Sequence, residues 1–239
     1  MKKKLLNLGH RGSPLKSIEN TIASFQLALD QGAHGFECDI RLSSDNEIVV
    51  FHDDSLDRLL EKKISIEALS LKEIQALRYE DGQQPCRLEE VLNQFSDCVI
   101  NIEIKKSAKA KEIHSPLIKL LKQQKSLDRF LISSFSSEIL RDSYQASSSS
   151  DLFVRLGFIF YEFDDANRKF IESSNWLYSL HPHHKLFSQI SELYQKPLWV
   201  WTPNDPSDWQ NFIENRGSLE ALITDDPKGL GQFLQSINS

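Results

Sequence analysis

Cysteine is scarce in this sequence: Cys38, Cys86 and Cys98 are the only three among 239 residues. Three cysteines at uneven spacings provide neither a disulfide framework nor the paired clusters that bind zinc. Free thiols are typical of proteins in a reducing compartment, so we expect a cytoplasmic protein.

Long hydrophobic runs are absent as well. The chain starts with Met1 and three lysines, as signal peptides often do, but the apolar residues that follow are only Leu5, Leu6 and Leu8. That stretch is too short for the hydrophobic region of a signal peptide. No run approaches the length that crosses a bilayer, so we predict no stable association with membranes.

The sequence also has no excess of positively charged residues. With 28 lysines and arginines against 34 aspartates and glutamates, the formal net charge is −6. Such a chain lacks the broad basic surface that nucleic acids bind, so we expect no nucleic-acid partner. An anionic substrate would have to be held by a local cluster of positive side chains.

Short apolar runs alternate with longer segments that carry apolar residues at helical spacing, such as Ile22, Phe25 and Leu29. This alternation favours parallel βαβ units. With about eight repeats, we predict a TIM-type (β/α)8 barrel, although the count alone does not exclude a doubly wound sheet. The strand candidates are residues 5–9, 35–40, 47–52, 99–105, 130–134, 152–158, 176–180, 198–202 and 221–224.

One strand candidate is surplus to eight. Residues 47–52 follow residues 35–40 after a polar turn, so the two form either one long bent β-segment or a hairpin-like extension of the second barrel strand. Residues 53–85 then read as an insertion with a short helix at 70–77, placed before a helix at 88–95. The serine-rich tract 147–150 reads as a loop at the end of a helix. No linker is evident, so we expect residues 1–239 to form a single domain.

His10, Arg11 and Gly12 directly follow the first predicted strand. In an α/β barrel the C-terminal ends of the strands form the active-site face. A histidine and an arginine there can supply an acid/base group and a phosphate clamp, and the glycine allows a sharp backbone turn. A surface loop with a charged pair is the alternative.

Glu37 and Asp39 lie two residues apart in the second predicted strand. Side chains at this spacing project to the same face, whereas Cys38 points to the opposite layer. Two neighbouring carboxylates inside a barrel repel each other unless a cation or a proton lies between them. Their oxygens suit a hard divalent ion, Mg²⁺ or Ca²⁺. The alternative is that both acids are solvated.

Glu103 and Lys105 share one face of a later strand, and Ile100, Ile102 and Ile104 face the helices. The pair is either a buried structural ion pair or a third metal carboxylate beside a phosphate-binding cation. His52 ends another strand candidate. Histidine titrates near neutrality, so two such residues could divide the work of donating and accepting a proton.

At these residues the sequence resembles the glycerophosphodiester phosphodiesterase family, and the matching motifs follow the family order along the whole chain. They are HRG at 10–12, ENT at 19–21, E-x-D at 37–39, V-x-x-HD at 49–53, NIEIKK at 101–106, SSF at 133–135, VWTPN at 200–204 and ITDDP at 223–227. Two departures are Ile18, where the family usually has proline, and Pro203, where it has valine.

The resemblance implies a metal-dependent phosphoric diester hydrolase that converts glycerophosphodiesters to glycerol 3-phosphate and an alcohol. It implies one divalent ion, Mg²⁺ or Ca²⁺, and a small-molecule substrate. The implied residues are His10 and His52 as the acid/base pair, Glu37, Asp39 and Glu103 as metal ligands, Arg11 and Lys105 as phosphate-binding residues, and Phe135 and Trp201 as walls of the glycerol pocket.

Several alternatives stay open from the sequence alone. Phe135 and Trp201 could be ordinary core aromatics. The nucleophile could be water or a neighbouring hydroxyl of the substrate. A phospholipase D-like enzyme on the same framework would need an apolar surface facing the membrane, but the insertion contains Tyr79 as its only aromatic residue. A catalytically silent barrel would be expected to lack a histidine or a metal-binding acid, and all of them are present.

Overall fold

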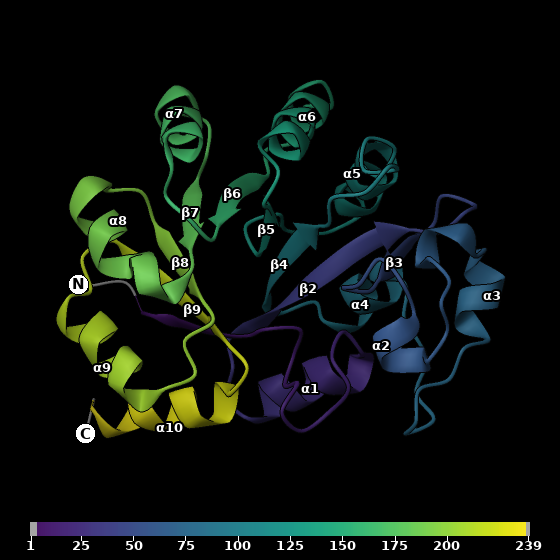
Figure 1. Cartoon of the computed structure of the whole chain (residues 1–239), viewed down its shortest axis with the longest axis horizontal. Coiled ribbons are helices and arrows are strands. Elements are labelled where there is room, and N and C mark those ends of the chain that lie inside the picture. Colours follow the sequence, from purple (N-terminus) through teal and green to yellow (C-terminus); the bar gives the residue numbers. More distant parts are fainter. Residues whose placement is uncertain (1–3, 238–239) are drawn as a thin grey trace.

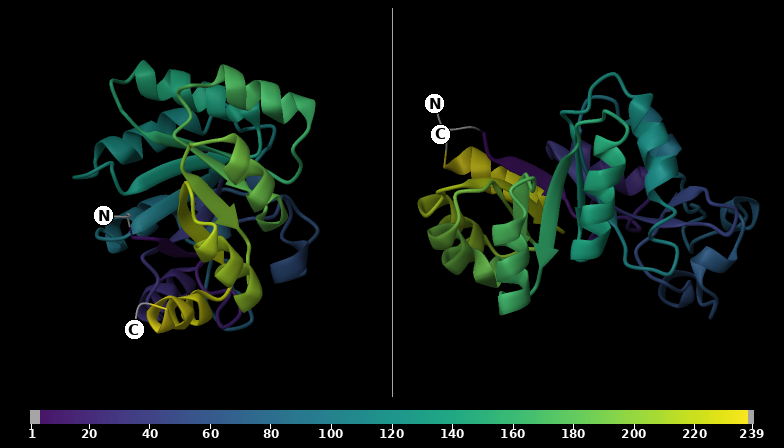
Figure 2. Two further views of the ribbon diagram at one scale, coloured as in Figure 1. Left: turned by 90° about the vertical axis from the view of Figure 1, so that its left-hand side faces the viewer. Right: turned by 90° about the horizontal axis from the view of Figure 1, so that it is seen from above.

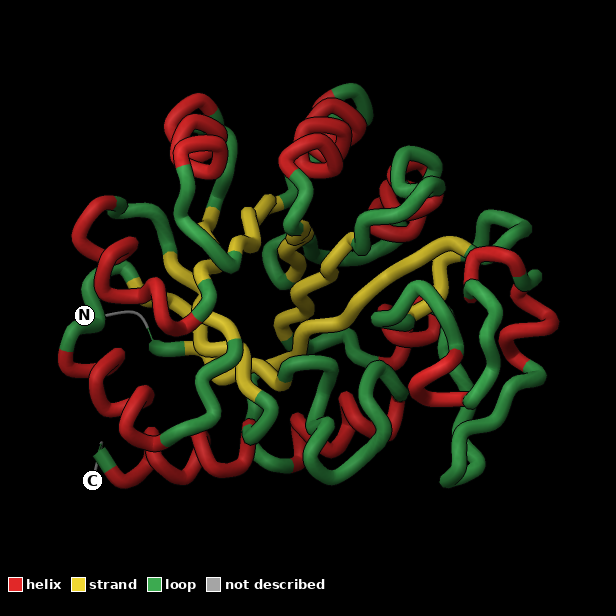
Figure 3. The backbone as a smooth tube through the Cα atoms, viewed as in Figure 1, coloured by secondary structure: helices red, strands yellow, loops and turns green. Residues whose placement is uncertain are grey.

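The computed structural model describes residues 4–237, so Met1 and the first two lysines of the basic start lie outside the described residues. Eight parallel strands follow one another around a closed barrel, because β1 pairs with both β9 and β2 (Figures 1 and 3). The prediction of a (β/α)8 barrel is confirmed. The barrel strands are β1 Leu6–Gly9, β2 Gly35–Leu42, β4 Val99–Ile104, β5 Phe130–Ser134, β6 Arg155–Phe160, β7 Ser179–Pro182, β8 Leu198–Trp201 and β9 Leu219–Thr224.

Helices form the outer ring around these strands (Figure 2). The serine tract 147–150 is only partly a loop, since its first two residues continue the helix before it. The ring consists of α1 Ile22–Asp30, α4 Leu88–Gln94, α5 His114–Lys122, α6 Ser137–Ser148, α7 Asp165–Ser173, α8 Phe187–Leu193 with the 3₁₀ turn His184–Leu186 before it, α9 Pro206–Glu214 and α10 Pro227–Ser236.

Capping side chains set where many of these helices begin. Thr21, Ser136, Asp164, Asp205 and Asp226 each accept a hydrogen bond from a backbone N–H in the first turn of the helix that follows. Such a cap satisfies a donor that the helix itself leaves free and contributes about 1 kcal/mol. Each of these caps therefore fixes the end of a loop that connects a barrel strand to the following helix.

The barrel strands have one apolar layer on their outer side and another on their inner side. Ile100, Ile102 and Ile104 face outward into the large core between strands and helices, as their alternation predicts. A smaller layer fills the barrel interior and consists of Leu8, Leu131, Trp199, Ala221 and Ile223. This inner layer closes the barrel below the ends of the strands.

A hairpin precedes the insertion. β3 Ile48–Val50 pairs antiparallel with the end of β2, which confirms the hairpin-like extension rather than one long bent strand. The insertion, residues 53–85, holds α2 Asp57–Leu60, the 3₁₀ turn Ile66–Ala68 and α3 Leu71–Gln75, at the right of Figure 1. Together with the hairpin it forms a separate apolar cluster that includes Val49, Phe51, Leu56, Ile66, Ile74 and Tyr79. Within residues 4–237, no helix has both the length and the apolar character needed to cross a membrane.

Only the strand predicted at 130–134 matches at both ends; most of the others differ by one or two residues, and β6 and β7 differ most. β6 and β7 begin three residues later than predicted, at Arg155 and Ser179. The apolar residues before them pack elsewhere: Trp176 stacks on Tyr144 of α6, and Phe153 is exposed. β3 ends at Val50, so His52 lies in the following loop rather than at the end of the strand.

Candidate active site

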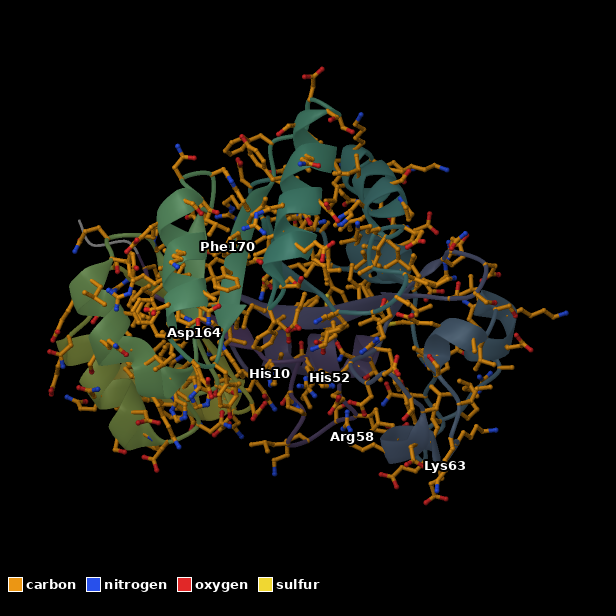
Figure 4. All side chains as sticks on the ribbon, turned by 45° about the horizontal axis from the view of Figure 1, so that its top comes forward. His10, His52, Arg58, Lys63, Asp164 and Phe170 are labelled. Atoms are coloured by element: carbon orange, nitrogen blue, oxygen red, sulfur yellow. The ribbon has the colours of Figure 1, made fainter. Side chains whose placement is uncertain are left out.

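The C-terminal ends of the barrel strands surround a cavity of about 90 Å³. It is lined by residues of all eight barrel strands or the loops directly after them, and by His52 from the loop after the antiparallel strand β3. Figure 4 labels His10 and His52 close to each other. Among the predicted site residues, eight line the cavity: His10, Arg11, Glu37, His52, Glu103, Lys105, Phe135 and Trp201. The ninth, Asp39, is buried beside Glu37 and Glu103.

The loop after β1 turns tightly, as predicted for its glycine. Gly12 has a positive φ of 92°, and a Cβ there would lie 2.4 Å from Oγ of Ser24. The adjacent Arg11 also has a positive φ, and its backbone N–H donates to the carboxylate of Glu37 at 3.0 Å. The turn therefore directs the arginine side chain back over the carboxylates of β2.

Three buried carboxylates form the centre of the site. Glu37, Asp39 and Glu103 are each at most 7% exposed, and one oxygen from each lies within 4.8 Å of the others. Asp39 and Glu103 are direct neighbours across β2 and β4. Asn20 donates to Oδ2 of Asp39 at 2.8 Å and accepts the backbone N–H of that residue. The two acids of β2 are thus inside the barrel rather than solvated.

The pKa values of the three carboxylates are shifted in different directions. Burial and the neighbouring carboxylates raise the pKa of Glu37 well above its ordinary value, and burial also raises the pKa of Glu103. Although burial opposes it, Lys105 and Arg11 lower the pKa of Asp39. Two of the three acids therefore resist ionisation in this arrangement, and an additional cation would relieve both.

Two cations border the carboxylates. Lys105 lies one residue beyond the end of β4, with its Nζ 2.7 Å from Oε1 of Glu103 and 3.2 Å from Oδ1 of Asp39. Burial opposes the charge, but these carboxylates raise the pKa of Lys105 to about 12. Nε of Arg11 lies 3.4 Å from Asp39. Both cations remain charged and face the cavity.

His10 is held by an acid from the last strand loop. Its Nδ1 lies 2.7 Å from Oδ1 of Asp225, and the other oxygen of Asp225 accepts from Asn204 at 2.7 Å. Burial opposes it, but the hydrogen bond from His10 lowers the pKa of Asp225. The carboxylate therefore fixes Nδ1 as the protonated nitrogen and leaves Nε2 of His10 as the reactive one.

His52 is held in the same way, through a longer chain of ion pairs. Its Nδ1 lies 2.6 Å from Oδ1 of Asp53, whose other oxygen accepts from Nε of Arg58 at 2.6 Å. Arg58 then forms a two-pronged ion pair with Glu19, and Glu19 also accepts from Arg11 at 3.0 Å. Burial lowers the pKa of His52. This chain joins the insertion to the loop after β1.

Aromatic side chains form one edge of the cavity mouth. Phe135 is 43% exposed, and its ring meets that of Trp201 edge-to-face with centroids 5.3 Å apart. Nζ of Lys105 lies 5.9 Å from the centroid of Phe135. Tyr161 and His183 extend this edge outward from Trp201. Phe135 is therefore not an ordinary core aromatic.

A wider groove of about 550 Å³ adjoins the cavity on the side of the insertion. The two spaces share His52 and Lys105, so a molecule bound at the carboxylates could extend into both. Apart from Ser55, the remaining lining is charged: Arg41, Asp53, Asp54, Asp57 and Arg58.

Sequence reasoning missed several residues of this site. Asp225 lies within the ITDDP motif and Glu19 within ENT, but neither received a role from the sequence. Asp225 and Asp226 directly follow the last barrel strand, and this pair of acids was the sequence signal that could have identified Asp225. Asn101 and His181 also line the cavity, and for His181 the strand bounds predicted from the sequence stopped one residue short.

Known proteins are similar to this chain over most of its length. The family model described as "Glycerophosphoryl diester phosphodiesterase family" matches residues 10–229. A glycerophosphodiester phosphodiesterase of Caldanaerobacter subterraneus subsp. tengcongensis is 30% identical over 95% of this chain and 96% of its own length.

Solved structures agree with the sequence comparison. A glycerophosphodiester phosphodiesterase of Thermotoga maritima superposes with a TM-score of 0.80 at 28% identity, covering 99% of this chain and all of that one. An Oleispira antarctica phosphodiesterase, in complex with its product sn-glycerol-3-phosphate, superposes with a TM-score of 0.82 at 25% identity and covers 95% of this chain and 96% of that one. The chain belongs to the glycerophosphoryl diester phosphodiesterase family and is a phosphoric diester hydrolase.

Proposed function

We propose that the protein hydrolyses small glycerophosphodiesters to glycerol 3-phosphate and an alcohol, with His10 and His52 as the acid/base pair and one divalent ion bound by the carboxylates. The observation that carries this proposal is the pair of histidines, each with Nδ1 held by a carboxylate, on one cavity with the buried acids. The product bound by the Oleispira antarctica relative supports the choice of substrate.

Glu37, Asp39 and Glu103 have the chemistry of a hard divalent-ion site. Their closest oxygens span no more than 4.8 Å, and an ion with metal–oxygen distances of about 2.0–2.6 Å can contact all three. Oε1 of Glu37 is buried and has no hydrogen-bond partner among residues 4–237. Mg²⁺ or Ca²⁺ bound there would act as a Lewis acid on a phosphate oxygen.

The charge count of the site favours a phosphodiester. Three carboxylates outnumber the cations Arg11 and Lys105 by one, so a bound divalent ion would leave one net positive charge. A phosphodiester carries one negative charge. Arg11 can present a planar pair of donors and Lys105 a point charge to its oxygens, which neutralises charge that develops during the reaction.

The two histidines can divide the proton transfers. Nε2 of each imidazole is free to face the reacting phosphate because the other nitrogen is held by Asp225 or Asp53. A neutral imidazole takes the proton of the attacking hydroxyl, and a protonated one donates a proton to the departing alkoxide. The attacking hydroxyl belongs either to water or to the glycerol end of the substrate.

The proposed activity is tested by incubating the enzyme with glycerophosphocholine and Mg²⁺ or Ca²⁺, and by measuring glycerol 3-phosphate with its dehydrogenase. Glycerophosphoethanolamine and glycerophosphoinositol in parallel assays would identify the preferred alcohol. The proposal is wrong if neither ion supports release of glycerol 3-phosphate from any of the three.

We expect deacylated substrates to be turned over faster than intact lipids. The groove beside the cavity is charged, and Tyr79, the only aromatic residue of the insertion, is buried. The lining of this groove offers acyl chains no apolar side chain to contact. Rates on glycerophosphocholine and on lysophosphatidylcholine, measured under identical conditions, provide the check; faster turnover of the lipid would contradict the expectation.

Arg58 is expected to position His52 through Asp53. In Arg58→Ala the carboxylate of Asp53 loses its second partner, and imprecise placement of a catalytic group can cost about 10²-fold in rate. The loss of a nearby cation also favours protonated His52, so its pKa rises. The limb of the pH–rate profile that reports His52 should therefore move to higher pH, whichever of the two roles this histidine has.

The conservative variant Arg58→Lys serves as the comparison, because it keeps the cation near Asp53 and Glu19. It should restore the position of the pH limb and part of the rate. Kinetics from pH 5 to 9, with kcat and KM determined separately, provide the measurement. An unshifted profile in Arg58→Ala, together with a uniform loss of rate, would show that Arg58 only supports the fold.

A further inference from the structure

The floor of the catalytic cavity contains polar side chains without partners. Asn101 on β4 and His181 on β7 both line the cavity and are at most 1% exposed. Neither atom of the Asn101 amide, nor Nδ1 of His181, has a hydrogen-bond partner among residues 4–237. Buried polar atoms are costly when unpaired, so their presence at one place indicates a group that enters the cavity and bonds to them.

These two residues lie deeper in the barrel than most of the carboxylates. Asn101 precedes Glu103 by two residues on the same strand and is the direct neighbour of Glu37 on β2. All three side chains therefore project into the barrel, with Asn101 one layer farther from the mouth than Glu103. The ring of His181 stacks on Trp199 of the inner apolar layer. Asn101 and His181 thus form the base on which a ligand would rest.

The chemistry of this floor suits hydroxyl groups. The amide of Asn101 offers both a donor and an acceptor. Burial lowers the pKa of His181 to about 3, so its imidazole is neutral, and Nε2 lies 2.9 Å from Oγ of Ser179. An anion would meet an amide oxygen here and the adjacent carboxylates of Glu37 and Glu103. A neutral hydroxyl can both donate and accept, which matches every unpaired atom of the floor.

The walls above the floor are apolar. Ile159, Ile223, Phe135 and Trp201 also line the cavity. Its volume of about 90 Å³ exceeds several-fold the roughly 10–15 Å³ that one water molecule needs, which is room for a short polyol fragment. Carbon atoms of such a fragment would contact the walls while its hydroxyls reach the floor.

We propose that Asn101 and His181 form a hydroxyl-binding floor that holds the glycerol end of the substrate by its free hydroxyl groups. This inference rests on the proposed function and extends it. The floor selects phosphodiesters that carry a small polyol on one side, whereas the carboxylates and cations above it act on the phosphate of any diester. Asn101 and His181 are specificity-determining residues for one end of the substrate.

The test compares two substrates in one variant. Asn101→Leu keeps a similar volume but removes both amide atoms. Its kcat/KM on glycerophosphocholine should fall about 10–100-fold, the effect of one or two lost hydrogen bonds, because each contributes up to about tenfold. On bis(p-nitrophenyl) phosphate, which has no hydroxyl group, kcat/KM should stay close to that of the unchanged enzyme.

A second variant and a binding measurement keep the test independent of folding. His181→Phe preserves the stack on Trp199 and should show the same selective loss. The unchanged enzyme, loaded with Mg²⁺, should bind sn-glycerol 3-phosphate more tightly than methyl phosphate in calorimetry, and both variants should lose this preference. Asn211→Leu, on the exposed face of α9, is the matched control and should change neither quantity.

The inference is overturned if Asn101→Leu lowers the rates on both substrates equally, because the residue would then support the carboxylates rather than recognise a hydroxyl. It is equally overturned if neither rate changes. Failure of the unchanged enzyme to hydrolyse glycerophosphocholine while it hydrolyses the nitrophenyl diester would instead contradict the proposed function, so the two failures are distinguishable.

Discussion

After complete removal of divalent ions, the purified enzyme is expected to hydrolyse glycerophosphocholine at a rate indistinguishable from background. A bound metal stabilises charge on phosphate by several kcal/mol, on the order of 10³-fold in rate at about 1.4 kcal/mol per decade. The reason specific to this chain is electrostatic. Burial and mutual repulsion raise the pKa values of Glu37 and Glu103, so their negative charge is unfavourable in the cluster and a bound cation would relieve it.

Glu37→Gln tests the same site by mutation. The variant removes one negative charge and one ligand oxygen, and it should weaken the binding of Mg²⁺ and Ca²⁺ in titration calorimetry as well as the rate. Excess metal should restore part of the activity of the variant. Glu192→Gln, a similar change at an exposed position of α8, is the matched control and should leave metal affinity unchanged.

Two results would contradict a metal requirement. One is full activity in excess chelator after elemental analysis has confirmed that the protein is free of metal. The other is an unaltered metal affinity in Glu37→Gln, which would place the ion elsewhere. Because calorimetry measures binding directly, a variant that loses activity for an unrelated reason is recognised as such.

The centre of the site was predictable from the sequence because strand geometry is regular. Side chains alternate with a period of two, so Glu37 and Asp39 must share a face of their strand, and Glu103 and Lys105 must share a face of theirs. The burial of Glu37, Asp39 and Glu103 in the barrel agrees with that reasoning. The order of the strands also followed from their alternation with helices, because parallel neighbours in a barrel are usually consecutive along the chain.

The groups that hold the histidines were not predictable in this way. Asp225 lies 215 residues from His10, and the two meet only because the last strand pairs with the first. Arg58, in the short helix α2, and Glu19, in the loop after β1, are 39 residues apart, and neither segment is long enough for a periodicity to indicate the direction of a side chain. Such contacts depend on closure of the barrel and on the path of the insertion, and a local pattern encodes neither.

Strand bounds failed where apolar residues had another place to pack. Trp176 looks like the start of a strand, but its ring stacks on Tyr144 and also meets Phe170 of α7. The strand therefore begins at Ser179, which brings His181 into the barrel interior. That displacement of a few residues is the reason why His181 was not predicted as a residue of the cavity.

Single replacement of His10 or His52 by alanine should lower the rate on glycerophosphocholine by about 10²–10⁴-fold, which is the usual contribution of general acid–base catalysis. His10 lies in the loop after β1 and His52 in the loop after β3, and neither belongs to the apolar layers. The folded state should therefore persist, as circular dichroism can verify. Loss of both should cost less than the product of the single effects, because residues that act as a unit are not additive.

The departing group distinguishes the acid from the base. If one histidine protonates the departing alkoxide, its alanine variant should recover on a nitrophenyl phosphodiester, since nitrophenolate leaves without a proton. The variant of the other histidine should remain slow on both substrates, because activation of the attacking hydroxyl is still required. The measurement is kcat/KM for each variant on glycerophosphocholine and on the nitrophenyl diester.

The two carboxylates behind the histidines provide the final control. Asp225→Asn and Asp53→Asn keep the shape of each contact but remove the charge that favours a protonated Nδ1. Each should reproduce, in weaker form, the substrate pattern of the histidine that it contacts. If both alanine variants kept rates near those of the unchanged enzyme on both substrates, neither histidine would transfer a proton. A different pair of groups in the cavity would then have to carry out the proton transfers.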